Sequence, residues 1–342
     1  VFLGDYIYES GAKEGRTRQH DGPTARTLDD YRRRYALYKS DPELKACHAA
    51  FPWIVTWDDH EVADNYAGEL NRKGRGGETF MRRRAAAYQA YYEHMPLRRI
   101  SMPQGNHMQL YRRLVYGDLA VFHMLDTRQY RSVQPRGHKM QPICDVVFDP
   151  AATMLGAKQE RWLFDGLKAS NTRWNVIAQQ VPVVQRIIPR DGTDMINTDK
   201  WDGYAVARKR LLDYLGNQHP SNPVVLTGDV HESWAADLLA DFSNPGSATV
   251  GTEFVTTSIS SNGDGKVMTK KGRRMLEANA HLKYYSKRRG YMRCEVTPGN
   301  WRTDFRIVDY VSRRGAGIST GASFVVEDGR PGTKKLDGDQ AG

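Results

Sequence analysis

Four short apolar runs in this chain each end in acidic or histidine residues. The runs and their endings are Val1–Leu3 before Gly4-Asp5, Trp53–Trp57 before Asp58-Asp59-His60-Glu61, Leu119–Leu125 before Asp126, and Val224–Thr227 before Gly228-Asp229-Val230-His231. Continuous apolar runs of this length are typical of strands that are buried on both faces of a sheet. Because functional groups in α/β proteins gather at the carboxyl ends of such strands, the pattern predicts an α/β fold with a site at one sheet edge.

Helical spacing separates these strands. We expect helices over Arg26–Ser40, Glu78–Met95, Lys158–Ser170 and Val206–Leu215, and further strands over Val255–Ile259 and Phe305–Val308. With 342 residues, 39% of them hydrophobic, the chain is long enough to bury a sizeable core. We expect a single catalytic domain over residues 1–326, followed by a polar, frayed tail over residues 327–342.

The balance of charge is basic. Lys and Arg number 50 against 40 Asp and Glu, which gives a formal charge of +10. A basic surface attracts phosphorylated substrates and nucleic acid, and charge alone does not choose between them. No apolar run approaches the ~18 residues that a membrane span needs. Three cysteines, Cys47, Cys144 and Cys294, lie far apart and show no metal-binding spacing.

The first candidate motif is Gly4-Asp5-Tyr6-Ile7-Tyr8. A carboxylate at a strand end, such as that of Asp5, can bridge two hard cations through its two oxygens. A phenolate at Tyr8 can bind a ferric ion. The motif is short, so a turn aspartate beside core tyrosines remains the alternative.

The second motif places three acids and a histidine in four consecutive positions, Asp58 to Glu61, with Asn65 close behind. Such charges are costly at the end of an apolar strand unless cations compensate them. Asp59 belongs to the site on this reading, and the amide oxygen of Asn65 is a reasonable ligand for a hard cation. His60 would protonate a leaving group or hold a phosphate oxygen. The alternative is a solvated helix start that is capped by Asp58 or Asp59.

The third motif is Gly228-Asp229-Val230-His231. Alternate residues of a strand point to one face, so Asp229 and His231 would face the same ion. A carboxylate with an imidazole suits a transition metal or a mixed-metal site.

In this order, the three motifs resemble the ligand blocks of calcineurin-like and purple-acid-type metallophosphoesterases. Those enzymes normally carry Asn where this chain has Asp59, and His where it has Asp229. More oxygen and less nitrogen shifts the metal preference toward calcium beside a harder redox metal, rather than paired zinc.

These departures match the PhoD-type alkaline phosphatases, which the chain resembles over nearly its whole length. The resemblance rests on Leu3–Glu9, Thr56–Val62, Ala87–Pro96, Leu125–Arg128, Trp201–Tyr204, Gly228–His231 and Lys287–Tyr291. It implies layered mixed β-sheets flanked by helices, around a calcineurin-like or purple-acid-phosphatase-like metallophosphoesterase core.

The resemblance also implies a ferric ion with two calcium ions. The metal ligands that it implies are Asp5, Tyr8, Asn65, Asp229 and His231. Arg83 would clamp the phosphate, since a guanidinium meets phosphate oxygens bidentately, although the choice among Arg82, Arg83 and Arg84 stays open. Asp202 is a candidate calcium ligand, with a turn-forming aspartate as the alternative.

Members of this family carry a cysteine ligand for iron on a strand before the Gly4-Asp5 strand. None of the three cysteines here occupies that place, so we expect the chain to begin inside a core strand and to lack the strand before it. The family acts outside the cytoplasm, so the resemblance implies a periplasmic, cell-envelope or secreted protein.

The implied reaction is metal-dependent hydrolysis of phosphate monoesters and diesters by a metal-activated water or oxo nucleophile. A phospholipase D-like diesterase is the alternative within the family. A basic polyanion-binding protein is the alternative outside it, with nucleic acid otherwise only a candidate substrate. Nothing in the sequence indicates a stable protein partner.

Overall fold

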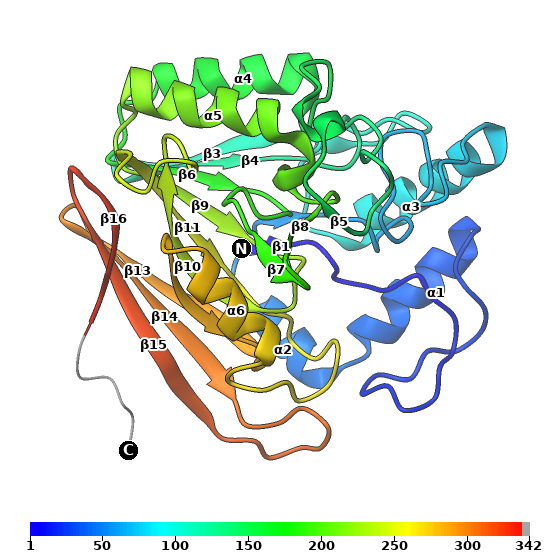
Figure 1. Cartoon of the computed structure of the whole chain (residues 1–342). Coiled ribbons are helices and arrows are strands. Elements are labelled where there is room, and N and C mark those ends of the chain that lie inside the picture. Colours follow the sequence, from blue (N-terminus) through cyan, green and yellow to red (C-terminus); the bar gives the residue numbers. More distant parts are fainter. Residues whose placement is uncertain (337–342) are drawn as a thin grey trace.

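The computed structural model describes residues 1–336 and shows a mixed α/β protein in layers (Figure 1). The helices are α1 (Leu28–Lys39), α2 (Pro42–Ala50), α3 (Glu78–His94), α4 (Gly156–Lys168), α5 (Ala205–Gln218) and α6 (Lys270–Ala278). Short 3₁₀ helices cover Arg99–Ser101, Asp145–Phe148 and Trp201–Tyr204. The layered α/β fold expected from the sequence is confirmed.

The largest sheet has seven strands. Their spatial order is β12 (Leu282–Ser286), β10 (Ser233–Leu239), β11 (Thr249–Val255), β9 (Pro223–Thr227), β6 (Trp174–Ala178), β4 (Ala120–Met124) and β3 (Arg112–Tyr116). The four strands β11, β9, β6 and β4 run parallel, and the outer strands are antiparallel to their neighbours. Every residue of β6 and β9 is buried, as the apolar run before Gly228 predicted.

Helices and a second sheet cover the two faces of this sheet. On one face, Leu163 of α4 and Leu211 of α5 pack in a cluster with Ile177 and Val225. The other face packs against an antiparallel sheet that consists of β13 (Gly290–Val296), β14 (Asn300–Val308), β15 (Ile318–Glu327) and β16 (Arg330–Lys335). Figure 1 shows this second sheet, in orange and red, lying across the strands β10 and β11.

The predicted frayed tail is wrong over most of its length. Residues 330–335 form β16, which pairs with β15, and Leu336 donates a backbone hydrogen bond to Ser323. The tail is polar because β16 is an edge strand whose side chains are mostly exposed. Residues 337–342 lie outside the described part of the chain.

The first residues of the chain form a short parallel pair beside the large sheet. Phe2 and Leu3 make β1, which pairs with β2 (Val55–Thr56), and the Thr56 hydroxyl donates to the carbonyl of Leu125 at 3.1 Å. Gly4 follows with a φ of 104°, and a Cβ on it would lie 2.4 Å from Asp58. Only glycine allows the two loops to meet this closely, which brings Asp5 next to Asp58.

A cluster of aromatic side chains supports these loops from α1 and α3. Trp57 stacks on Tyr88 with ring centroids 4.2 Å apart, and Tyr31 and Tyr35 of α1 are buried in the same cluster. The helix α1 begins at Leu28, two residues after the expected Arg26, because Thr27 and Asp30 form a capping box.

A small third sheet forms one border of the site described below. It consists of β5 (Met140–Pro142), β8 (Thr193–Asn197) and β7 (Ile188–Arg190) in that order. Among residues 1–336, no helix is both long and apolar enough to cross a bilayer.

The expected elements differ from the observed ones at a few places. The four expected helices are present, with boundaries shifted by up to three residues. The expected strand over 255–259 is wrong, since β11 ends at Val255 and the chain then forms a loop. The helices α2 and α6 were not expected.

Candidate metal centre and its pocket

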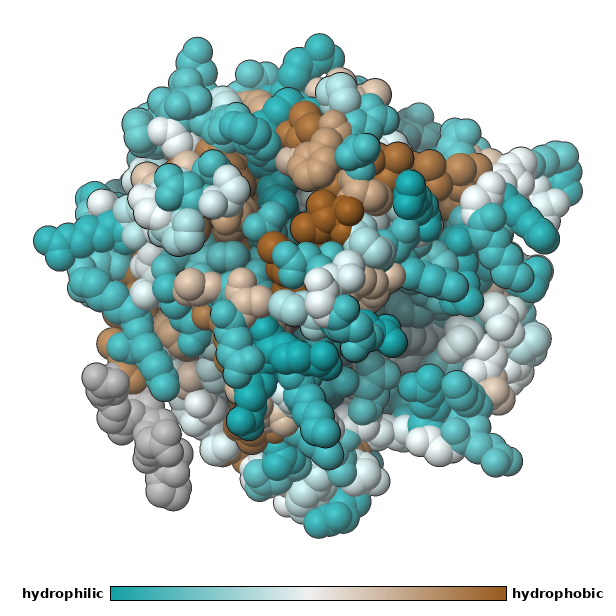
Figure 2. All heavy atoms as spheres, viewed as in Figure 1, coloured by the Kyte–Doolittle hydropathy of each residue, from teal (hydrophilic) through white to brown (hydrophobic). Residues whose placement is uncertain are grey.

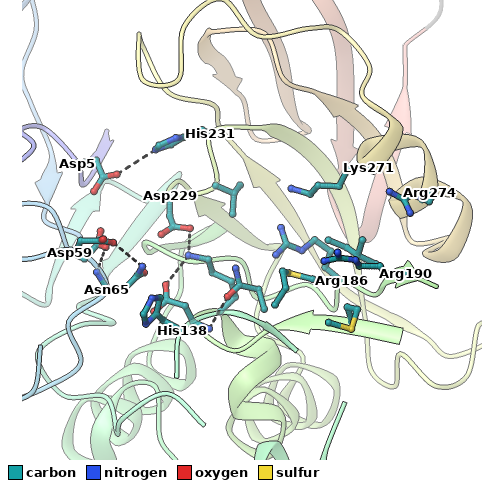
Figure 3. Close-up of a pocket in the computed structure, with 18 of the residues that line it drawn as sticks. Asp5, Asp59, Asn65, His138, Arg186, Arg190, Asp229, His231, Lys271 and Arg274 are labelled. Atoms are coloured by element: carbon teal, nitrogen blue, oxygen red, sulfur yellow. Dashed lines mark hydrogen bonds and ion pairs between the residues drawn. The ribbon is translucent and has the colours of Figure 1, made fainter. Parts of the chain in front are cut away.

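A pocket of about 670 Å³ opens at the carboxyl ends of β1, β2 and β9. One side of it carries acidic, amide and histidine groups, and the other side carries basic groups (Figure 3). The predicted site residues that line it are Asp5, Asp59, His60, Asn65, Asp229 and His231.

Two overlapping groups of side chains on the acidic side could hold a metal ion. Ligand atoms of Asp5, Asp59 and His60 lie within 4.8 Å of one another, and so do those of Asp58, Asp59 and Asp229. The Oδ1 atom of Asp5 is buried and has no hydrogen-bond partner among the described residues. Burial raises the pKa of Asp5, and the neighbouring His60 offsets this only in part. A carboxylate oxygen left in this way fits a bound cation.

The backbone is strained where the predicted ligands sit. Asp5, Asn65, Asp229 and His231 have φ angles of 56°, 51°, 65° and 54°, in the left-handed region that L-residues rarely adopt. Such strain persists only where the surrounding structure enforces it, and it concentrates at functional sites.

Tyr8 contacts both Asp5 and His231, although it does not itself line the pocket. The Tyr8 hydroxyl donates to Asp5 Oδ2 at 3.0 Å and lies 2.9 Å from His231 Nε2. Burial and the charge of Asp5 raise the pKa of Tyr8 well above its ordinary value. The other ring nitrogen of His231 lies 2.7 Å from the side-chain nitrogen of Asn262.

The expectation that Asp229 and His231 alternate on one strand is wrong. The strand β9 ends at Thr227, so the two residues lie in a loop and do not alternate on a strand. Both still line the pocket, and each adopts a left-handed backbone conformation. Asp229 contacts basic side chains, whereas His231 Nε2 lies 3.7 Å from Asp5 Oδ2.

His60 is held by a buried carboxylate. Its Nδ1 atom lies 2.6 Å from Oε2 of Glu9. Burial lowers the pKa of His60, but the charges of Asp59, Asp5 and Glu9 outweigh it and raise that pKa well above the ordinary value. The imidazolium is therefore the favoured form, which suits proton donation to a leaving group.

Glu61 has a supporting place that the sequence did not reveal. It is fully buried and accepts backbone N–H groups from Asp5 at 3.1 Å, Tyr6 at 2.5 Å and Asp58 at 2.8 Å. Burial raises its pKa to about 8. Glu61 thus holds together the two loops that carry the first and second motifs.

Arg128 is a central residue of the site that sequence reasoning missed. Its guanidinium is fully buried and contacts Asp58 at 2.5 Å, Asp199 at 2.9 Å and Asp229 at 3.1 Å. Lys200, also buried, contacts Asp199 and Asp229. The motif Leu125–Arg128 is visible in the sequence, but nothing in it indicates these distant partners. Asp58 is likewise a buried ion-pair partner and not a helix cap.

The structure does not bring Arg83 into the pocket. Its Nε atom donates to the hydroxyl of Tyr31 at 2.9 Å, which places it between α3 and α1. Arg82 pairs with Glu78, and Arg84 donates to the carbonyls of Asn106 and Gly68. None of the three arginines lines the pocket, so the assignment of Arg83 as phosphate clamp has no support in this geometry.

Asp202 is also outside the pocket. It is buried, pairs with Arg208, and accepts the backbone N–H of Arg186 at 3.3 Å. Since Asp202 does not line the pocket and instead holds the backbone of Arg186, the structure gives it a supporting place and not a place among the candidate ligands.

Comparisons with known proteins match the chain to a single family. Residues 1–305 match the PhoD-like phosphatase family. Alkaline phosphatase D of Bacillus subtilis (strain 168) is 48% identical over 339 residues, which make up 98% of this chain and 58% of that protein. The chain therefore spans less than two thirds of this relative.

A solved structure described as that of PhoD has the same fold. It superposes with a TM-score of 0.95 at 47% identity, covering 100% of this chain and 67% of the solved chain. The family match covers the strand-end loops, and with them every candidate ligand. The chain belongs to the PhoD-like phosphatase family.

Proposed function

We propose that this protein hydrolyses phosphate esters at the acidic side of the pocket, with monoesters and diesters as substrates. The observation that carries the proposal is a group of carboxylates: Asp5 and Asp59 offer ligand atoms within 4.8 Å of each other, and so do Asp58, Asp59 and Asp229. The unpartnered Oδ1 of Asp5 supports a cation there. Membership of the PhoD-like phosphatase family supports the reaction class.

We further propose that the cations are a ferric ion and two calcium ions. Asp5, Tyr8 and His231 would hold the ferric ion, since phenolate and imidazole suit it. The oxygen atoms of Asp59, Asn65 and Asp229 would hold calcium. When bound, these ions would activate water for attack on phosphorus and neutralise the charge on the phosphate oxygens.

The side chains of the chain itself would divide the remaining work. His60, oriented by Glu9, would give its proton to the oxygen of the departing alcohol. Arg128 and Lys200 would hold Asp229 in place through their ion pairs. Glu61 would keep the loops of Asp5 and Asp58 at a fixed separation.

An assay with an aryl phosphate and a bis-aryl phosphate tests this function on the metal-loaded, full-length protein. We expect turnover of both esters, and loss of more than about 100-fold in kcat/KM for Asp5→Asn, as for other groups that act directly on the transition state. The ratio of the two activities separates a phosphatase from a phospholipase D-like diesterase. Absence of hydrolysis, together with salt-dependent retardation of nucleic acid in a gel, would favour the polyanion-binding alternative.

We also propose, from family resemblance, that the protein acts outside the cytoplasm. Fractionation of the source cells, followed by detection with an antibody, checks this. Recovery of the protein only with cytoplasmic markers would contradict it.

A further inference from the structure

One buried arginine in the wall of the pocket lacks a partner for its charge. Arg186 is 4% exposed, lines the pocket, and stacks on Trp234 with its guanidinium carbon 5.0 Å from the ring centroid. Within residues 1–336, its guanidinium makes no hydrogen bond or ion pair with any other residue. Because Arg186 lines the pocket, an anion that enters the pocket can reach its guanidinium and pair with it.

The other buried arginines show that this is unusual for the chain. Arg128, Arg131 and Arg208 pair with aspartates. Arg34, Arg84 and Arg289 donate to backbone carbonyls. Among the buried arginines of the described chain, Arg186 alone is left with only an aromatic ring.

More positive charge surrounds Arg186 on the same side of the pocket. Figure 3 shows Lys271 and Arg274, from α6, and Arg190, from β7, gathered near it and away from Asp5 and Asp59. Burial, and next to it the charge of Arg186, lowers the pKa of Lys271, as expected for two neighbouring cations.

Only part of this positive charge is compensated. Lys271 pairs with Glu232, and among residues 1–336 the one ion-pair partner of Arg190 is the exposed Asp191 at 3.5 Å. Arg274 is exposed and has no ion-pair partner in the described part of the chain. This side of the pocket therefore carries an excess of positive charge.

Arg186, Arg190, Lys271 and Arg274 form the basic wall of the pocket, and hydrogen bonds hold the backbone at Arg186 and Ile187 in place. The side chain of Asn279, at the end of α6, bonds both the N–H and the carbonyl of Ile187, at 2.9 and 2.7 Å. Asp202 accepts the backbone N–H of Arg186 and pairs with Arg208. These bonds fix the backbone of Arg186 and Ile187, and Trp234 supports the guanidinium, as in a preorganised binding site.

We propose that Arg186, with Lys271, Arg274 and Arg190, forms a second anion subsite for the alcohol half of the substrate. The inference rests on the proposed function, and it names the substrate class: phosphate esters whose alcohol carries a second phosphate group. In the reaction, water forms the new O–P bond and the P–O bond to the alcohol breaks. The alcohol takes up a proton and leaves with its second phosphate still on the basic wall.

A matched pair of substrates tests the subsite, namely propane-1,3-diol monophosphate and propane-1,3-diol bisphosphate. For the metal-loaded, full-length protein we expect kcat/KM to favour the bisphosphate by about tenfold or more, beyond the twofold statistical factor, because hydrogen bonds to charged groups are strong. Arg186→Gln should reduce the preference to about twofold while changing kcat/KM for the monophosphate little. Arg161→Gln, on the exposed surface of α4, should keep the full preference.

The ratio of the two substrates separates a binding defect from a folding defect, since misfolding lowers both activities together. If Arg186→Gln is unstable, Arg274→Gln, at an exposed position, should lower the preference without a change in thermal unfolding. An unchanged preference in both variants, or no preference in the unaltered protein, would overturn the subsite.

Calorimetry with the bisphosphate separates this inference from the proposed function. If the protein hydrolyses neither ester, the proposed function fails. Weaker binding of the bisphosphate by Arg186→Gln than by Arg161→Gln would then still support the subsite. Equal binding by the two variants would end it.

Discussion

The buried guanidinium of Arg128 lies 3.1 Å from Oδ1 of Asp229, which joins the third motif to the second. The same guanidinium contacts Asp58 at 2.5 Å and Asp199 at 2.9 Å. One cation thereby compensates carboxylates from three distant parts of the chain. Arg128 therefore holds Asp58, Asp199 and Asp229 close together independently of any metal ion.

Replacing Arg128 by Met should destabilise the protein severely. Removing one member of a buried ion-pair network leaves its partners uncompensated, at a cost of about 3–5 kcal/mol. Chemical denaturation monitored by tryptophan fluorescence measures the change, with Arg161→Met on the exposed face of α4 as control. Equal stability of the two variants would show that Arg128 does not organise the site.

His60→Gln should slow esters of poor leaving groups more than esters of good ones. A proton donor matters most where the departing oxygen is basic, and general acid catalysis contributes roughly 10²–10⁴-fold. We therefore expect a large loss with phenyl phosphate and a small loss with 4-nitrophenyl phosphate. Equal losses with both substrates would instead assign His60 to binding a metal ion or a phosphate oxygen.

Arg83→Gln should leave catalysis almost unchanged. Its Nε bonds Tyr31 and it does not line the pocket, so we expect kcat/KM within about twofold of the unaltered value, with a stability loss of about 1 kcal/mol. Steady-state kinetics and thermal unfolding measure the two effects. A loss of kcat/KM of about 30-fold or more, with stability retained, would restore the phosphate-clamp assignment.

His123 should make the protein less stable in acid. Burial, assisted by the charge of Arg113, lowers the pKa of His123 to about 4. Between about pH 6.5 and 4 the unfolded chain binds a proton that the folded protein does not, so stability falls as the pH falls, by roughly 3 kcal/mol in all.

His123→Phe removes this proton, so its stability should fall less over the same pH range. Urea denaturation of both proteins at several pH values gives the comparison. An equal loss of unfolding free energy in the two proteins as the pH falls would show that His123 does not cause the acid sensitivity.

The strand-end motifs could be predicted because each apolar run marks a buried strand and the first polar residue marks its end. Asp5, Asp59 and Asp229 were found in this way, and all three line the pocket. The roles of Arg128 and Asp199 could not be predicted, because their contacts join residues about 70 positions apart with no local pattern.

The sequence did not show which way some helical side chains face, and it did not reveal two of the helices. The three consecutive arginines at 82–84 point in different directions around α3, so the sequence alone did not show which way Arg83 faces. The helix α2 has no buried residue, so it lacks the apolar periodicity that predicts a helix, and α6 is a short helix that buries only Gly272 and Met275. Two residues of the basic wall, Lys271 and Arg274, lie on α6 and were missed together with it.

Metal analysis of the full-length protein, combined with activity, tests the central claim most directly. Elemental analysis should find iron and calcium, and calcium chelation should abolish turnover of an aryl phosphate until calcium is restored. Asp5→Asn should lose metal and activity together, because its carboxylate carries the unpartnered oxygen of the site. Stoichiometric zinc with full activity in excess calcium chelator, or a fully active Asp5→Asn variant, would contradict the account.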